Sequence, residues 1–329
     1  MPHSFLSDVK DNENISGTFG VVKKLSVKKY ANGFSFILEL YDKTGTMNAT
    51  YWGPNDENSV ADIFDSISVG GFVEISGKGN AWNNKLTISI DGKTGFNLQK
   101  VDSTSVDLEN FIKKSSRDIP QMIEELHQIV SEINNEHIKK LLESFTNNDD
   151  FMKKKYSQAP AGKMWHHDFV GGLLEHVLSL ISMSKTIRQS HPELNLDLLI
   201  AACILHDIGK VVEYERLENF SIGITTEGRL FGHLSIGYFM VAKRISEMSD
   251  FPEDLRLRIL HMILSHHRKL DQGSPVVPMF PEAVAFSLID DADAQSQHMV
   301  QVVTDPKEDF VYDRLASHYN WTKPMDENQ

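Results

Sequence analysis

Eight apolar residues in succession, from Leu198 to Leu205, end in the pair His206-Asp207. This run predicts a buried helix, and a solvated surface pair would not be expected at its end. Lys210 lies three residues after Asp207 and four after His206, so on a helix the three side chains would crowd one turn. An imidazole and a carboxylate side by side can bind a metal ion, and a lysine one helical turn later can help that metal to bind an anionic substrate.

Other histidines and acids follow the same pattern. His176 lies within a helical apolar pattern and borders its buried face. Downstream, His233, the pair His266-His267 and Asp290 each lie in or at the end of an apolar segment. A lone buried histidine is usually a packed core residue, but several with acids in one region indicate a metal site.

The order His, His-Asp, His, His-His, Asp resembles the HD superfamily of metal-dependent phosphohydrolases. The segments HHDFVGGLLEHVLSL, CILHDIGK, GHLSIG and ILSHHRKLDQGSPVVPMFPEAVAFSLIDDADA are similar to the YhaM family of 3′-to-5′ exoribonucleases. The resemblance covers about residues 156–300 and extends upstream in a weaker form. It implies an all-α HD domain that hydrolyses phosphodiesters.

The resemblance also implies a ligand set. One metal would be held by His176, His206, Asp207 and Asp290, and Asp207 would bridge to a second metal. The second metal would be held by three histidines: His233, His266 and His267. Adjacent residues on a helix point about 100° apart, which leaves open whether both members of the histidine pair bind and whether there are one or two ions.

Several assignments around this set are less specific. Asp207 and Lys210 are the predicted catalytic residues, and Lys210 would bind a non-bridging phosphate oxygen. Asp290 is preferred over Asp291 and Asp293 because the resemblance implies an acid directly after the apolar run. His166 and His167 would contact substrate phosphate or simply end a loop. Mixed imidazole and carboxylate ligands suit Mn²⁺, our preferred ion, with Fe²⁺, Zn²⁺, Co²⁺ and Mg²⁺ as alternatives.

The first hundred residues have a different pattern. From Ile15 to about Lys100, short alternating runs are broken by turn residues, with Asn32-Gly33 as a strong hairpin signal. Further turns are predicted at 42–45 and 83–84, and a short helix around 60–67. Five strands with one helix fit an OB-type Greek-key β-barrel, although another small barrel would show similar alternation.

The predicted barrel carries a candidate surface for a single strand of nucleic acid. Its basic residues are Lys23, Lys24, Lys28 and Lys29, and Trp52 offers a ring for base stacking. Each aromatic residue of a small barrel is also a candidate for its core. Tyr51 and Trp52 are neighbours on a strand, so at most one of them points inward.

The expected organisation is therefore multidomain α and β. It comprises an OB domain at 1–104, a helical connector at 105–155 and an HD domain at 156–329. In the connector, Pro120 fits the first turn of a helix. The polar tail after Asp305 is expected to be partly disordered.

Composition limits the setting and the partners. The single cysteine, Cys203, lies in the apolar run, which excludes a disulfide framework and favours a reducing compartment. No apolar run approaches the roughly 20 residues of a membrane span, and the N-terminus is unlike a signal peptide, so we expect a cytoplasmic protein without membrane association. The net charge of −13 argues against coating nucleic acid through bulk electrostatics, but not against local basic contacts or bound cations.

The hypothesis from the resemblance is a 3′-to-5′ exonuclease that degrades single-stranded RNA to nucleoside monophosphates, with single-stranded DNA as an open second substrate. One alternative is an HD hydrolase of small or cyclic nucleotides in which the barrel is regulatory. A second is a binding module whose HD site is inactive, which the intact ligand series disfavours. Homo-oligomerisation stays open.

Overall fold

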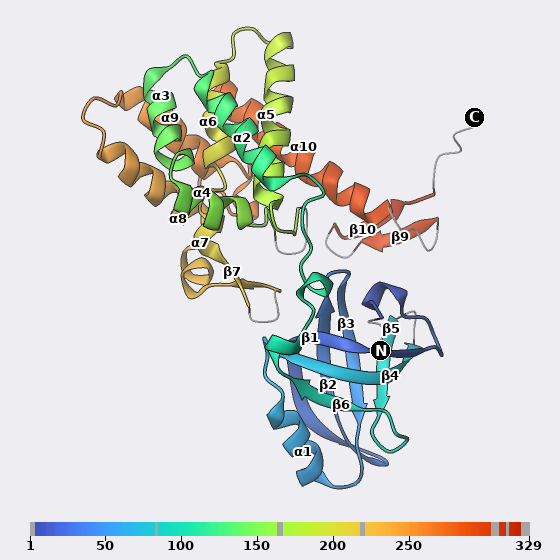
Figure 1. Cartoon of the computed structure of the whole chain (residues 1–329). Coiled ribbons are helices and arrows are strands. Elements are labelled where there is room, and N and C mark those ends of the chain that lie inside the picture. The colour runs from blue at the N-terminus through green and yellow to red at the C-terminus, as the bar shows by residue number, and fades with distance from the viewer. Residues whose placement is uncertain are drawn as a thin grey trace. The chain divides into compact units, whose positions relative to one another are not determined.

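The structure is a computed structural model of the chain and describes residues 4–82, 85–162, 167–217, 221–303, 309–313 and 316–323 (Figure 1). The chain forms two compact units, Met1–Lys113 with Arg216–Gly223 and Lys114–Glu215 with Ile224–Gln329. The predicted connector at 105–155 is divided between them. Within the described part of the chain, no helix is both long enough and apolar enough to cross a membrane.

The first unit is a closed barrel of antiparallel strands with one parallel pair. Its six strands, one more than predicted, run in the order β1-β2-β3-β5-β4-β6, and β1 also pairs with β4, which closes the barrel. The parallel pair is β3 with β5, and helix α1 connects β3 to β4. This connectivity is the OB-type Greek-key barrel that the sequence predicts. The elements are β1 (Asn14–Tyr30), β2 (Gly33–Asp42), β3 (Gly45–Trp52), α1 (Glu57–Ser66), β4 (Phe72–Trp82), β5 (Lys85–Asp91) and β6 (Leu98–Val101).

The turns of the barrel follow the sequence signals closely. In the first hairpin Tyr30 pairs with Gly33, so Ala31 and Asn32 form the loop, one residue earlier than predicted. The second hairpin closes at the pair of Asp42 and Gly45, as expected. The predicted turn at Asn83-Asn84 lies outside the described residues. As the alternation predicts, Tyr51 is buried while its neighbour Trp52 is half-buried.

The second unit is built from helices around one apolar core. Its helices are α2 (Ile119–Ser131), α3 (Glu136–Thr146), α4 (Asp149–Lys154), α5 (Gly172–Ser190), α6 (Leu196–Leu205), α7 (Lys210–Glu213), α8 (Thr226–Ser246), α9 (Glu253–Ser265) and α10 (Pro281–Val303). Every residue of the run from Leu198 to Leu205 is buried, so α6 is the central helix that its composition predicts. Pro120 lies in the first turn of α2, as expected.

The described chain also contains two short antiparallel ribbons, the first of which is divided between the two units. The first pairs β7 (Tyr214–Arg216) with β8 (Ile222–Ile224), and the second pairs β9 (Phe310–Asp313) with β10 (His318–Trp321). The second ribbon lies in the tail for which the polar composition predicts partial disorder. Residues 309–313 and 316–323 of this tail are held by cross-strand pairs and a buried polar network, and the rest of the tail lies outside the described residues.

Candidate metal centre

The end of α6 fixes the pair at the centre of the site. His206 ends the helix and its backbone N–H donates to Ala202, so the ring and Asp207 lie at the negative end of the helix dipole. Gly209 lets helix α8 come close to this turn. A Cβ atom at Gly209 would lie 2.1 Å from the carbonyl oxygen of His233. The glycine therefore lets a third ligand candidate approach the pair.

Asp207 lies between two groups of histidines, with one carboxylate oxygen facing each. Its Oδ2 is 3.1 Å from His206 Nε2. Its Oδ1 is 3.4 Å from His233 Nε2 and 3.7 Å from His266 Nε2. A carboxylate placed in this way can bridge two cations, which is the arrangement implied by the resemblance.

The imidazole rings are oriented by bonds at the nitrogen that faces away from Asp207. His206 Nδ1 lies 3.0 Å from the carbonyl oxygen of Cys203, and His266 Nδ1 lies 2.8 Å from that of Ile263. Carbonyl groups only accept, so each Nδ1 carries the proton and each Nε2 offers a lone pair. A carboxylate lies beside the third ring, since Glu213 Oε2 is 3.0 Å from His233 Nδ1 and Oε1 accepts from the backbone N–H of His233 at 3.3 Å.

His176, on helix α5, joins the cluster through α10. Its Nε2 is 3.1 Å from Asp290 Oδ1, and its Nδ1 is 2.7 Å from Asp293 Oδ2. Asp293 also accepts from the hydroxyl of Ser179. The predicted ligand Asp290 therefore faces the cluster, while Asp293 holds the opposite side of the ring.

Both members of the histidine pair contribute to one group. Nitrogen atoms of His233, His266 and His267 all lie within 4.8 Å of one another. Side chains of neighbours on a helix diverge by about 100°, but α9 ends at Ser265 and the ring centroids of His266 and His267 are 4.3 Å apart. His267 Nδ1 lies 3.0 Å from the carbonyl oxygen of Gln272, which orients its ring.

The residues present fit a divalent cation. Among the described residues, four buried atoms at the centre have no hydrogen-bond partner: His206 Nε2, His233 Nε2, His266 Nε2 and Asp207 Oδ1. Buried polar atoms are normally satisfied, and these four converge, so a shared cation accounts for them. Histidine nitrogens and carboxylates are ligands of first-row transition metals. These residues are therefore the ones that could hold a divalent cation.

The pKa values of Asp207 and His266 are shifted in the direction that favours metal binding. Burial alone would raise the pKa of Asp207, but the neighbouring His206 and Lys210 hold it well below its usual range. Burial and the neighbouring His267 hold the pKa of His266 well below its usual range, so that ring is neutral. Ligands must be deprotonated to bind metal, and both groups already are.

Lys210 is buried beside this cluster. Its Nζ is 2.6 Å from Asp207 Oδ2, and it also donates to the carbonyl oxygen of Ala161. Burial alone would lower the pKa of Lys210, but the charge of Asp207 raises it. A charged lysine cannot ligate a metal, so Lys210 supplies a fixed positive charge next to the ligands.

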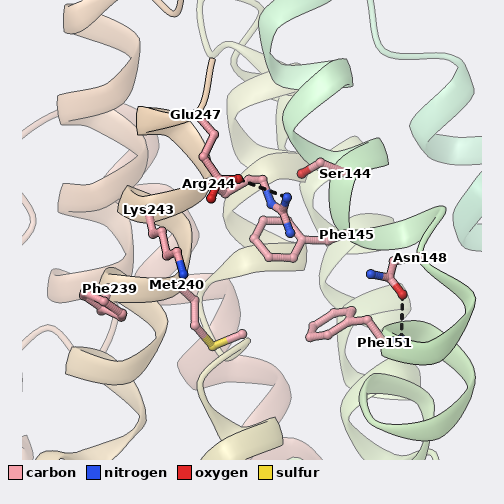
Figure 2. Close-up of a pocket in the computed structure, with 9 residues that line it drawn as sticks. All are labelled: Ser144, Phe145, Asn148, Phe151, Phe239, Met240, Lys243, Arg244 and Glu247. Carbon is pink, nitrogen blue, oxygen red and sulfur yellow. Dashed lines mark hydrogen bonds and ion pairs between the residues drawn. The ribbon is translucent and has the colours of Figure 1, made fainter. Parts of the chain in front are cut away.

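A hollow of about 250 Å³ opens over the cluster. Asp207, Lys210, His266, His267 and Asp290 form part of its lining, so a substrate in it would reach the ligands directly. A different hollow of about 300 Å³, between α3, α4 and α8, has another character (Figure 2). Its one acid, Glu247, is 3.2 Å from Arg244, and it contains no histidine. That second hollow cannot hold the metal.

The pKa of His176 predicts a pH-dependent stability. Burial alone would lower this pKa, but hydrogen bonds to Asp290 and Asp293 raise it from 6.5 to about 9. The folded, metal-free protein therefore keeps a proton that the unfolded chain loses above pH 6.5. We expect its free energy of unfolding to be highest, for this group, below pH 6.5 and to decrease as the pH rises to 9.

Urea unfolding of chelator-treated protein at pH 6.5, 8 and 9.5 measures this decrease. His176→Gln should remove it, while the same change at the exposed His191 should leave it in place. An equally steep decrease in the His176→Gln protein would assign the proton to another group.

The structure separates the predicted barrel residues into two sets. Lys23, Lys28 and Lys29 are exposed on β1, and the ring of half-buried Trp52 lies 5.0 Å from that of Tyr30. Lys24 instead donates to the carbonyl oxygens of Phe64 and Ile67, at 2.7 Å each. It caps the end of α1, which is at odds with the prediction that it binds substrate.

Of the two histidines before α5, the structure describes only His167. His166 lies outside the described residues. His167 is 3% exposed, with Nε2 3.4 Å from Asp293 and Nδ1 3.9 Å from Glu175. Burial beside two carboxylates is at odds with the prediction that His167 contacts a substrate phosphate. Its contact with Asp293 instead supports the ring of His176.

Sequence reasoning missed the supporting acids. Asp293 is three residues from Asp290, so both lie on one face of α10, and nothing in the sequence shows which nitrogen of His176 each meets. Glu213, on α7, is the second of these acids and lies against His233. No local signal identifies that role, because it depends on how α7 and α8 pack.

The fold and the cluster define a class: a protein with an OB-type barrel and a metal-dependent HD domain. The HD domain family matches residues 173–295, which contain every histidine and acid of the predicted ligand set. The 3′-5′ exoribonuclease YhaM of Shouchella clausii (strain KSM-K16) is 32% identical over 288 residues, which are 85% of this chain and 83% of that protein. The chain belongs to the YhaM family of 3′-5′ exoribonucleases.

Two solved structures are similar over about a third of the chain. A domain of replication protein A from Methanococcus maripaludis is 24% identical, with a TM-score of 0.25, and covers 31% of this chain and 97% of that one. Pot1pC of Schizosaccharomyces pombe, solved with single-stranded DNA, is 14% identical with a TM-score of 0.26, and covers 33% of this chain and 93% of that one.

Proposed function

We propose that this chain is a metal-dependent exonuclease that shortens single-stranded RNA from its 3′ end and releases nucleoside monophosphates. The family supports this activity, since the Shouchella clausii relative is named a 3′-5′ exoribonuclease. The observation that carries the chemistry is the position of Asp207 between two groups of histidines, beneath a hollow that exposes the cluster. Single-stranded DNA is a second candidate substrate.

Divalent cations, when bound, lower the pKa of water and stabilise charge on a phosphodiester. The chain's own residues would arrange the substrate around them. Asp207 and Asp290 hold negative charge at the cluster, which confines cations there. Lys210, fixed by Asp207 and Ala161, points a positive charge at the same hollow and would bind a non-bridging phosphate oxygen.

We also propose Mn²⁺ as the working ion and two ions as the working number. The number is supported by the two oxygens of Asp207, which face different histidines. The ion is supported by the mixture of neutral imidazoles and carboxylates, which suits Mn²⁺, Fe²⁺ and Zn²⁺ better than Ca²⁺. Elemental analysis of protein purified without added metal would give the identity of the ion and the number of ions per chain.

Incubation with 5′-labelled single-stranded RNA and Mn²⁺ tests the activity. Products should form a ladder that shortens from the 3′ end, with nucleoside monophosphate as the released product. An intact strand together with hydrolysis of a cyclic nucleotide would instead make the protein a small-nucleotide phosphodiesterase. The rate on single-stranded DNA of the same sequence, compared with the rate on RNA, measures the preference for ribose over deoxyribose.

We propose that the barrel contacts the strand through Lys23, Lys28, Lys29 and Trp52. Removing two charges with Lys28→Ala/Lys29→Ala should raise KM for a 20-nucleotide strand. It should also reduce the salt dependence of binding, by about 0.7 in the logarithmic slope for each lost phosphate contact. Turnover of a p-nitrophenyl phosphodiester should not change, because that ester does not reach beyond the metal centre.

The matched control is Lys10→Ala/Lys100→Ala, which removes the same charge from two other exposed lysines of the barrel unit. Equal effects of the two double variants would mean that net charge, and not this surface, sets the affinity. The change Trp52→Ala tests stacking separately, at about 1–3 kcal/mol for one stacked base.

A further inference from the structure

The β9–β10 ribbon exposes an aromatic face and buries a polar one. Figure 1 shows it beside the C-terminal end of α10. Four aromatic residues occupy its outer face and are 50–69% exposed: Phe310, Tyr312, Tyr319 and Trp321. Its other face carries Asp313 and Asn320, which are only 7% and 6% exposed. Packing alone would favour the reverse arrangement.

A polar network holds the ribbon in this orientation. Asp313 Oδ2 pairs with Nε2 of buried His298 on α10, and Asn320 Nδ2 donates to the same oxygen at 3.3 Å. The backbone N–H of Thr322 donates to Asp309 at 2.9 Å, beyond the last strand pair. An isolated two-stranded ribbon is at best marginally stable in water. The network therefore keeps the aromatic face presented to solvent.

The four rings form a regular array. Trp321 pairs with Phe310 across the strands, and Tyr319 pairs with Tyr312, with ring centroids 5.1 Å apart for the tyrosines. Successive rings on the same side of one strand are about 6.8 Å apart. That spacing is about twice the 3.4 Å rise between stacked bases, which leaves room for one base between two rings.

The array is too small to join two copies of the chain by itself. Four aromatic side chains that are half to two-thirds exposed offer roughly 500 Å². A standard protein interface needs about 800 Å² from each partner. Stacking on bases needs no such area, because each base contributes about 1–3 kcal/mol through one ring face. The net charge of −13 also leaves a polyanion dependent on uncharged contacts.

We infer that the outer face of the β9–β10 ribbon is a stacking platform for unpaired bases of a single-stranded nucleic acid, an inference that rests on the proposed exonuclease function. The platform and the metal centre share one rigid element, since α10 carries Asp290, Asp293 and His298. His298 lies eight residues after Asp290, which is about 12 Å along a helix. A strand whose 3′ end lies at the metals would therefore pass the ribbon a few nucleotides upstream.

Binding of a fluorescein-labelled 20-nucleotide oligouridylate, followed by anisotropy in EDTA, tests the platform in the full chain. The double variant Tyr319→Ala/Trp321→Ala should raise Kd at least tenfold, and Tyr319→Phe/Trp321→Phe should restore affinity to within about threefold of the original. Phe239→Ala is the matched control, because it removes a ring that is 66% exposed on α8. Turnover of a p-nitrophenyl phosphodiester with Mn²⁺ should be the same in all four proteins and shows that each is folded.

Two results would overturn the platform. In the first, the double alanine variant binds the strand within twofold of the original protein. In the second, light scattering shows that the alanine variant loses an oligomer while the Kd of each protomer is unchanged, which would assign the face to a second copy. Failure of the original protein to degrade any RNA is a separate result and counts against the proposed function.

Discussion

Asp207→Ala is expected to abolish hydrolysis and to remove most of the bound metal. Its two oxygens are the atoms that face both histidine groups, at 3.1 Å from His206 and 3.4 Å from His233. Asp290 lies within 4.8 Å of His206 and His266, but no other acid among the described residues is as close to both groups as Asp207. Removing it also leaves the buried Lys210 cation without its carboxylate partner. We expect turnover to fall below detection, by at least about 10⁴-fold, because the protein loses the cations that activate water and stabilise charge.

Metal content by elemental analysis and turnover of 5′-labelled RNA measure the two effects together. The matched control is Asp291→Ala, a neighbour of the ligand Asp290 whose carboxylate pairs with Arg268 at 2.9 Å. That variant should keep its metal and most of its activity. Wild-type metal content and turnover in the Asp207→Ala protein would show that the centre is assigned to the wrong residues.

Lys210→Ala is expected to separate the binding of metal from catalysis. The charged ammonium is no ligand, so metal content should remain near normal. Turnover should fall by about 10²–10³, the usual cost of one charge-stabilising donor. The structure adds that Lys210 also holds Asp207 and the carbonyl oxygen of Ala161, so its removal loosens one oxygen of the bridging carboxylate.

Lys210→Arg distinguishes the two roles of this lysine. An arginine keeps the charge but cannot fit the same buried space, so it should restore little of the rate. If metal and activity instead fall together in Lys210→Ala, the lysine serves only to position Asp207. Thermal unfolding of each variant in excess Mn²⁺ checks that the helical unit is still folded.

The features that could be predicted from sequence are those fixed by local pattern. The apolar run of α6 predicts its own burial, and the pair at its end predicts the centre of the site. The alternation at Tyr51 and Trp52 correctly predicts their opposite faces. The order of strands in the barrel follows from five alternating runs and one helix, because few topologies accommodate them.

The remaining features depend on how distant segments meet. Lys24 belongs to the same basic strip as Lys23, but β1 has irregular register between Val21 and Lys23, and only packing against α1 shows where the ammonium goes. The role of Asp293 depends on the rotation of the His176 ring. The ordered tail depends on the contact of Asp313 with His298, which no local pattern encodes.

The four buried atoms of the metal centre that have no hydrogen-bond partner also affect how long the protein survives in a cell. A buried polar atom without a partner costs about 1–3 kcal/mol, and the cation that binds it recovers that cost. Newly synthesised chains therefore fold to a less stable form until they acquire their ions. A difference of 1–2 kcal/mol can change cellular abundance several-fold, because proteases remove unfolded chains. Scarcity of the metal would then lower the amount of this enzyme as well as its rate, and so couple RNA turnover to the nutrition of the cell.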